Sequence, residues 1–323
     1  MKDASTKIIL YLAPLRGFTE YIYRNAFSRH FSGFDIAVAP FIPTMSDARL
    51  KKKHLEDVRP ENNQAMPVIP QIIGNKAEDF ILLAKRLFDL GYETVNWNLG
   101  CPFPMVAKKK RGSGLLPYPQ KIEAFLETTL PAIPNRLSIK ARLGRKKTDE
   151  ILSLLKIFNR YPLDEVIIHP RTGKQMYAGE PDLDMFEKCL EVCTHATVYN
   201  GDINNLETFK VFSKRFKTID RWMIGRGALI NPFLPASIRN GKDGSADKVA
   251  VFRAFYDDLF AGYREEFHGP GHLLDRMKGF WTYFSRSFKD GHKIKKKIHR
   301  THKLDHYVRI VDRFFEEDAQ WVD

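Results

Sequence analysis

Short runs rich in Val, Ile and Leu alternate along most of the chain with longer segments whose apolar residues recur at helical spacing. Eight runs have the length and composition of buried strands: residues 8–12, 35–39, 68–72, 94–97, 137–140, 165–168, 196–199 and 221–224. Between them, residues 77–90 are a typical predicted helix. This alternation predicts an α/β fold, a (β/α)8 TIM barrel. A doubly wound sheet is the alternative, but no Gly-x-Gly-x-x-Gly motif follows the first run.

The pattern changes after residue 235, because only helical periodicity follows. Residues 240–244, Asn-Gly-Lys-Asp-Gly, have the composition of a linker. Three apolar stripes follow it, made of Val249, Phe252, Tyr256, Leu259 and Tyr263, of Leu273, Met277, Phe280, Trp281 and Phe284, and of Leu304, Val308, Val311 and Phe315. We therefore predict two domains, a barrel over residues 1–240 and a small helical bundle over residues 241–323.

Composition narrows the class of protein. The chain has 323 residues, of which 43% are hydrophobic, and its mean hydropathy is −0.36. It shows no signal-like opening segment and no apolar run of membrane-spanning length, so we expect no membrane association. Its three cysteines do not make a disulfide framework, which favours a cytoplasmic location. No obligate protein partner is evident from the sequence.

The charge is strongly positive, with 52 basic and 39 acidic residues and a formal net charge of +13. Such a balance favours a polyanion, above all a nucleic acid, as partner. The positive charge is concentrated in residues 108–111, 145–147 and 289–303. We interpret residues 289–303 as a connecting segment able to grip a phosphate backbone, although a solvated basic surface is the alternative.

Polar residues follow or end nearly every predicted strand, where the active sites of barrel enzymes lie. Packing alone does not explain so many of them. Together with the turn residues beside them, they make up the candidate site: Pro14, Leu15, Arg16, Gln71, Asn98, Cys101, Lys140, His169, Arg171, Asn200, Gly201, Asp202, Gly225 and Arg226.

The loops after the seventh and eighth strands commonly form a phosphate site in this fold. Gly201 and Gly225 would let backbone N–H groups approach phosphate oxygens, and Arg226 would add charged hydrogen bonds. Lys140 would then lie beside a cofactor ring and stabilise negative charge on it, as a reduced flavin requires. Ordinary turn glycines, a surface lysine and, for His169, a satisfied core histidine are the alternatives.

Cys101 ends the fourth strand in the sequence Asn-Leu-Gly-Cys-Pro. The charge run at 108–111 and a predicted flexible loop at 112–114 suggest an anionic partner near its thiol. A buried structural cysteine is the alternative. Cys189 and Cys193, at helical spacing near His195, lack a second ligand pair, so we predict no metal site.

Several of these segments together resemble the tRNA-dihydrouridine synthase family, and they occur in the family's order. They are Ala13-Pro14-Leu15, Asn98-Leu99-Gly100-Cys101-Pro102, Lys140-Ala141-Arg142-Leu143-Gly144, His169-Pro170-Arg171-Thr172, Asn200-Gly201-Asp202 and Ile224-Gly225-Arg226-Gly227-Ala228. The resemblance implies an FMN-dependent barrel, a helical domain that helps to hold tRNA, and reduction of a uridine C5–C6 bond with NADPH as reductant.

The resemblance also implies roles for single residues. Cys101 would give a proton to uracil C5, and a thiol with a pKa of about 8.5 stays protonated at neutral pH. Asn98 and Arg171 would bind the substrate, and the other strand-end residues would bind FMN. Two alternatives remain open: an FMN-dependent barrel dehydrogenase acting on a small pyrimidine, and a non-catalytic RNA-binding protein on a barrel scaffold.

Overall fold

The computed structural model describes residues 8–46, 50–242, 244 and 247–322, so residue 243 of the predicted linker lies outside the described residues. A parallel sheet forms the centre, in the strand order β3-β5-β6-β7-β8-β9-β10-β1-β2-β4. Its strands are β1 (Ile9–Leu12), β2 (Ile36–Val38), β3 (Ile42–Pro43), β4 (Val68–Ile69), β5 (Gln71–Ile73), β6 (Thr94–Leu99), β7 (Arg136–Gly144), β8 (Val166–Thr172), β9 (Thr197–Tyr199) and β10 (Arg221–Ile224).

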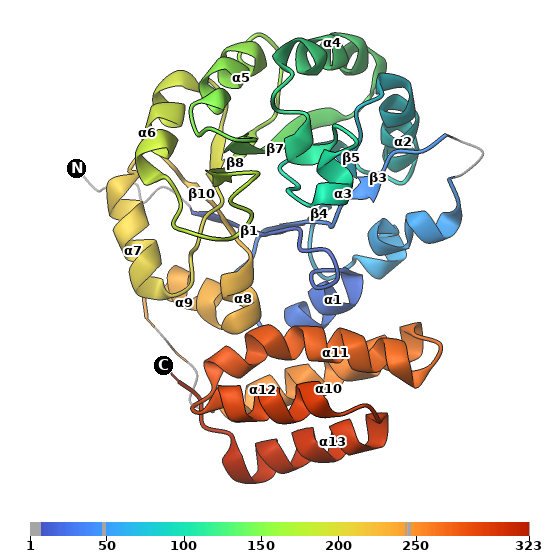
Figure 1. Ribbon diagram of the computed structural model, residues 1–323, viewed down its shortest axis with the longest axis vertical. Helices are drawn as coiled ribbons and strands as arrows, with labels where there is room; N and C mark the ends of the chain where they lie inside the picture. Colours follow the sequence, from blue (N-terminus) through green and yellow to red (C-terminus); the bar gives the residue numbers. More distant parts are fainter. Residues whose placement is uncertain (1–7, 47–49, 243, 245–246, 323) are drawn as a thin grey trace.

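The sheet closes on itself. β4 and β5 are one chain segment interrupted only at Pro70, which has no N–H to donate, and β2 and β3 are likewise consecutive parts of one segment. β2 pairs with β4 and β3 pairs with β5. The two ends of the strand order are therefore the same two segments, and the ring has the eight strands of a TIM barrel. This confirms the predicted fold class (Figure 1).

Helices surround the ring, because each buries one apolar face against the strands (Figure 1). They are α1 (Tyr21–His30), α2 (Ala77–Asp89), α4 (Pro119–Thr129), α5 (Glu150–Phe158), α6 (Leu183–Val192), α7 (Leu206–Arg215), α8 (Arg226–Ile230) and α9 (Leu234–Asn240). The predicted helix at 77–90 is α2, which buries Phe80, Ala84 and Leu87. Between the second and third strands lie three 3₁₀ turns, Lys52–His54, Glu56–Val58 and Pro60–Asn62.

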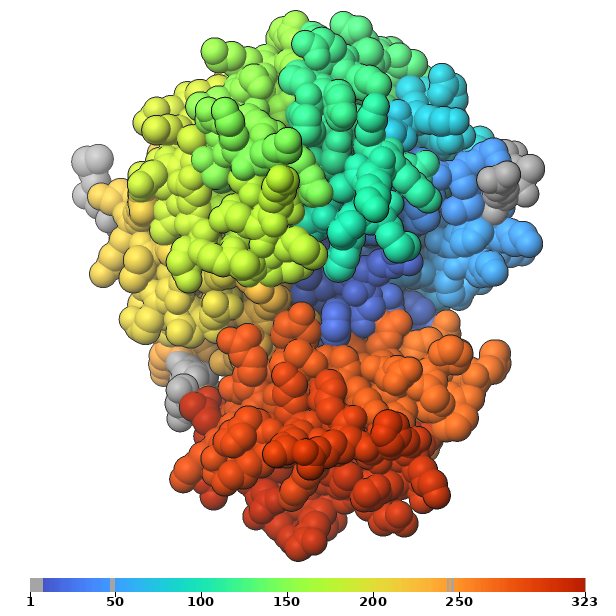
Figure 2. All heavy atoms as spheres, viewed as in Figure 1, coloured from blue at the N-terminus to red at the C-terminus, as the bar shows by residue number. Residues whose placement is uncertain are grey.

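The last four helices form a bundle, as predicted. They are α10 (Lys248–Glu266), α11 (Pro270–Phe284), α12 (Gly291–Arg300) and α13 (Leu304–Arg313), and they appear in orange and red beside the barrel, at the lower end of the molecule in Figures 1 and 2. Within the described residues, no helix is both long and apolar enough to cross a membrane.

One prediction for this part of the chain was wrong. Residues 289–303 were expected to connect two helices, but most of them form α12. Ile294 and Ile298 explain the difference, since they are one helical turn apart and both buried, which fixes a helix against the bundle core. The lysines of the segment occupy the other faces of α12.

The bundle packs against the first loop and the first helix of the barrel. On the barrel side, Phe18 makes edge-to-face contacts with Phe280 and Tyr283, with ring centroids 5.3 and 5.1 Å apart. Arg276 of α11 donates to the Gly17 carbonyl and to Glu20 Oε2, the latter at 2.7 Å. The contact therefore brings α11 beside the loop that follows β1. The division at residue 240 stays a prediction.

Candidate active site

A cavity of about 410 Å³ lies at the carboxyl ends of the barrel strands. All but two of the predicted site residues line it: Pro14, Leu15, Arg16, Asn98, Cys101, Lys140, His169, Asn200, Gly201, Asp202, Gly225 and Arg226. The other two, Gln71 and Arg171, are fully buried and hydrogen-bonded to residues of the cavity wall. The barrel thus gathers side chains that are far apart in sequence at one opening.

The side chain of Asn98 shapes the turn that carries Cys101. Its Oδ1 accepts hydrogen bonds from the backbone N–H groups of Gly100 at 3.0 Å and Cys101 at 2.9 Å. Its Nδ2 donates to Gln71 Oε1 at 2.6 Å, and Gln71 Nε2 donates to Asn96 Oδ1 at 2.7 Å. This buried chain of amides fixes the orientation of each member, because in each of these bonds an N–H meets a carbonyl oxygen.

A second set of hydrogen bonds holds the carbonyl of Cys101. Both the backbone N–H and the Oγ of Ser113 donate to it at 3.0 Å. Arg145 Nη1 in turn donates to Ser113 Oγ at 3.0 Å and to the Pro102 carbonyl at 3.3 Å. The backbone of Cys101 is therefore bonded on both its N–H and its C=O side, and the residue lines the cavity.

Residues 112–114 differ from the expected flexible loop. They form a buried 3₁₀ turn, Gly112–Gly114, packed against Cys101. Gly112 has a φ of 55°, and a Cβ there would lie 2.8 Å from Cys101 Cβ. Only glycine allows so close an approach with a positive φ. The prediction missed this because a Gly-Ser-Gly sequence is typical of both flexible loops and tight packing.

The environment of Cys101 favours the protonated thiol. The residue is 7% exposed, and burial raises the pKa of its thiol, while a backbone hydrogen bond at Phe103 and the charges of Arg142 and Arg16 offset this only in part. A thiol of this kind is a poor nucleophile and a suitable proton donor at neutral pH.

Lys140 is a half-buried cation of the cavity wall. Burial, and then the charge of Arg142, lower the pKa of Lys140 to about 7. Arg142 itself is anchored, since it donates to the carbonyls of Gly100 at 3.0 Å, Thr172 at 2.9 Å and Met176 at 2.6 Å. In the part of the chain that the structure describes, no carboxylate forms an ion pair with Lys140. An anionic ligand in the cavity would compensate its charge.

Asp202 links Arg226 of the cavity wall to the buried Arg171. Its carboxylate accepts from Arg171 and Arg226, each at 2.5 Å. Burial alone would raise the pKa of Asp202, but the bonds from Arg171 and the charge of Arg226 outweigh it and hold the pKa below its usual value. Asp202 therefore stays ionised and fixes Arg226 at the cavity.

The ring of His169 is neutral. Burial and the nearby charges of Arg142 and Lys140 hold the pKa of His169 well below its usual value. Arg171 Nη1 lies 3.1 Å from His169 Nε2. A guanidinium can only donate, so Nε2 accepts and the ring proton resides on Nδ1.

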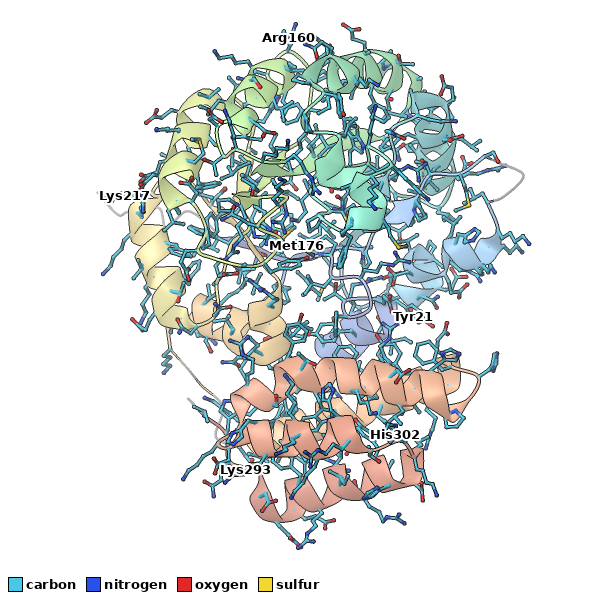
Figure 3. The ribbon with its side chains drawn as sticks, in the orientation of Figure 1. Tyr21, Arg160, Met176, Lys217, Lys293 and His302 are labelled. Carbon is cyan, nitrogen blue, oxygen red and sulfur yellow. The ribbon has the colours of Figure 1, made fainter. Side chains whose placement is uncertain are left out.

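Two tyrosines of the cavity wall were not predicted as site residues. Tyr177 is 40% exposed and lies between two guanidinium groups, 5.3 Å from Arg142 and 5.1 Å from Arg226. Tyr177 directly follows Met176, which is labelled in front of the ring of barrel strands in Figure 3. Its place between Gly173 and Gly179, after a strand, was a usable signal. Tyr283 comes from α11, and nothing in its own helical stripe distinguishes it from a core residue.

Trp97 and Cys189 are core residues. Trp97 is fully buried and stacks on Phe125 at 4.0 Å. Cys189 is buried in α6, where burial raises its thiol pKa to about 12. Across the described residues, no group of three or more His, Cys, Asp or Glu could hold a metal ion.

The basic segments lie on different parts of the surface. Lys108, Lys109 and Lys110 are exposed in the turn after α3 (Pro104–Ala107). At 145–147 the three backbone N–H groups bind the carboxylate of Glu150, at the start of α5. Lys293, Lys296 and Lys297 of α12 border a separate groove of about 950 Å³ between α12 and α13.

Comparison with known proteins gives a family. The model described as "Dihydrouridine synthase (Dus)" matches residues 11–317. The chain is 25% identical over 312 residues to "Probable tRNA-dihydrouridine synthase" of Staphylococcus epidermidis, which covers 94% of this chain and 92% of that protein. It is 26% identical over 316 residues to "Probable tRNA-dihydrouridine synthase 2" of Bacillus subtilis, covering 94% and 93% of the two chains.

The fold also resembles solved structures of low sequence identity. TcOYE, solved with pHBA, is 12% identical with a TM-score of 0.55, over 79% of this chain and 94% of that one. The old yellow enzyme homologue NCR from Zymomonas mobilis is 12% identical with a TM-score of 0.53, over 75% and 91%. At this identity the likeness concerns the barrel fold alone.

Proposed function

The chain belongs to the dihydrouridine synthase family, and we propose that it reduces the C5–C6 double bond of a uridine in tRNA to dihydrouridine. It is then a flavin-dependent oxidoreductase whose active site is the cavity at the strand ends. The observation that carries this assignment is the pairing, in one cavity, of the buried thiol of Cys101, whose pKa is raised, with the half-buried amine of Lys140. A proton donor and a stabiliser of negative charge are what reduction of an enone-like ring requires.

FMN fits the cavity on three grounds. The volume of about 410 Å³ is in the ~300–1,000 Å³ range of small-molecule sites. Among the residues that the structure describes, no carboxylate pairs with Lys140 in this cavity. Gly225 packs closely against the wall, since a Cβ there would lie 3.3 Å from Ala13 Cβ, and the neighbouring guanidinium of Arg226 lines the cavity, where it could bind a phosphate.

We assign the cofactor contacts to the lining residues by their chemistry. Gly201, Gly225 and Arg226 are proposed to bind the phosphate, with Asn200 and Asp202 fixing this wall. The loop of Pro14, Leu15 and Arg16, together with Gln71, Lys140 and His169, is proposed to border the ring.

The chemistry that FMN supplies when bound is hydride transfer to C6 of the uracil, with NADPH as the proposed reductant. The protein completes the reduction by moving one proton from the Cys101 thiol to C5, so that C5 and C6 each gain one hydrogen. Cys101 then regains its proton from solvent. The elevated pKa of the thiol keeps the donor protonated until the substrate is bound.

The two predicted substrate residues have different surroundings. Asn98 lines the cavity and keeps one Nδ2–H beyond its bond to Gln71, so we propose that it also binds the uracil edge. Arg171 is 1% exposed and bonded to Asp202 and the Gly179 carbonyl. We propose that it acts on substrate indirectly, by holding Asp202 and His169.

We further propose that the helical bundle and the basic segments hold the tRNA, since the net charge of +13 favours a polyanionic partner. The uridine would be turned out of its stack to enter the cavity. The cytoplasm, where tRNA and NADPH meet, is the proposed site of the reaction.

The test is dihydrouridine mapping by mass spectrometry on unmodified tRNA with FMN and NADPH. We expect product at a defined uridine with the intact enzyme, a loss of about 10²-fold or more in rate with Cys101→Ala, and little change with Cys193→Ala, which lies outside the cavity. Flavin-loaded protein that leaves every tRNA unmodified but reduces free uracil would instead establish a small-pyrimidine dehydrogenase.

A further inference from the structure

Two apolar side chains stand exposed immediately after Cys101. Phe103 is 51% exposed and lines the cavity, while Met105, on α3, is 82% exposed. Exposed apolar groups at the edge of a site mark contact with a ligand or partner more often than isolated ones elsewhere. In Figure 1, α3 stands in front of the strand ring, and Phe103, directly before it, lines the cavity.

The segment that carries these side chains is held rigidly. Asn75 Nδ2 donates to the carbonyls of Lys109 at 3.0 Å and Lys110 at 3.1 Å, just beyond α3. The Lys110 ammonium lies 4.9 Å from the centre of the Tyr118 ring. Before α3, the carbonyl of Cys101 is fixed by Ser113. Since both ends of the segment are anchored, little conformational entropy is lost when a ligand binds to it.

The neighbouring charge defines what such a ligand is. Lys108, Lys109 and Lys110 are exposed directly after Met105 and the end of α3. Apolar or aromatic groups next to a row of cations match the two parts of a nucleotide, a flat base and a phosphate. An apolar protein partner would explain the exposed side chains but would have no use for the cations.

We propose that Phe103 and Met105 form a platform on which an unpaired tRNA base next to the target uridine stacks, while the lysines at 108–110 bind its phosphates. The inference rests on the proposed function and adds to it a determinant of which uridine is chosen. A uridine enters the cavity only if its neighbour fits the platform. Flexible, unpaired loops of tRNA therefore suit the enzyme better than paired stems.

The direct test uses tRNA with 2-aminopurine beside the uridine that mapping identifies, on its 5′ or its 3′ side. We expect intact enzyme to quench one of the two probes, Phe103→Ala to quench it less, and Phe103→Trp to quench it at least as strongly, because tryptophan restores the stacking surface. Equal fluorescence with Phe103→Ala and the intact enzyme at both positions would overturn the platform.

The kinetic test compares kcat/KM on unmodified tRNA. We expect Phe103→Ala with Met105→Ala to lower it about tenfold or more, mainly through KM. Val211→Ala is the matched control, since Val211 is 60% exposed on α7 and outside the cavity. If the intact enzyme makes no dihydrouridine, the proposed function itself is wrong. If the intact enzyme makes product normally and the double variant keeps the same kcat/KM, only the proposed platform is wrong.

Discussion

At the scale of single residues, Cys101 is positioned through its backbone and tuned through its burial. Asn98 and Ser113 hold its N–H and its carbonyl, so neither bond competes for the thiol. Burial then raises the thiol pKa. Position and protonation thus come from different neighbours, and a substitution can change one without the other.

The lowered pKa of Lys140 makes cofactor binding depend on pH. With a pKa of about 7, Lys140 is mostly neutral in the flavin-free protein above neutral pH. A bound anion favours the ammonium form, so FMN binding takes up a proton and tightens as pH falls from about 9 toward 7. We expect Lys140→Met to bind FMN more weakly near pH 7 and to lose this dependence.

The measurement is the FMN dissociation constant, followed by flavin fluorescence across that pH range. Lys156→Met, on the outer helix α5, serves as a control that keeps the slope of the intact protein. A slope that survives in Lys140→Met would assign the proton to another group.

At the scale of elements, the sequence predicts strands better than it predicts their ends. All eight apolar runs are strands, but β7 extends to Gly144 although the run stops near Lys140. Lys140 and Arg142 interrupt the apolar pattern because they serve the cavity, while the backbone continues its ladder with β8. Polar residues that serve a site break the apolar pattern, so a prediction based on that pattern ends the strand too early.

The site followed the same logic. Residues at strand ends could be predicted because the fold dictates where strand ends meet. Tyr283 could not, since its place at the cavity depends on how α11 packs against Phe18, which no local pattern encodes. Tyr177 was not predicted as a site residue, although a loop after a strand is seldom part of the core.

α12 allows a prediction about RNA binding at the same scale. Lys296, Lys297 and Arg300 border the groove between α12 and α13. If they bind phosphates, replacing all three by Gln weakens tRNA binding and lowers the slope of log K against log salt by about 0.7–0.9 for each lost contact.

The salt dependence of tRNA affinity measures this effect. Lys188→Gln with Lys214→Gln, on α6 and α7, is the matched control and is expected to leave the slope unchanged. The same slope for the α12 variant and the intact protein would place the tRNA on another surface.

At the scale of the whole molecule, Arg276 fastens the bundle to the barrel. Its half-buried guanidinium bonds both Glu20 and the carbonyl of Gly17, in the loop that continues from Leu15. We expect Arg276→Leu to lower the free energy of unfolding by about 1–3 kcal/mol, because Glu20 and the carbonyl lose a charged donor. KM for tRNA should rise as well, since the loop borders the cavity.

Urea denaturation and steady-state kinetics test this expectation. Arg309→Leu is the control, because its exposed pair with Asp305 at 3.5 Å contributes less than about 0.5 kcal/mol. Equal losses of stability in the two variants would mean that the contact between bundle and barrel is as weak as a surface ion pair.

The position of Tyr283 on α11 also means that the barrel is synthesised before its cavity is complete. The strand ring is complete once β10 has been synthesised, yet one wall of the cavity belongs to a helix that leaves the ribosome later. Since chains fold from the N-terminus as they emerge, a nascent barrel can close while its cavity is still open on one side. A chain that stops before α11 therefore has the thiol and the cations in place but lacks the surface that completes the cavity.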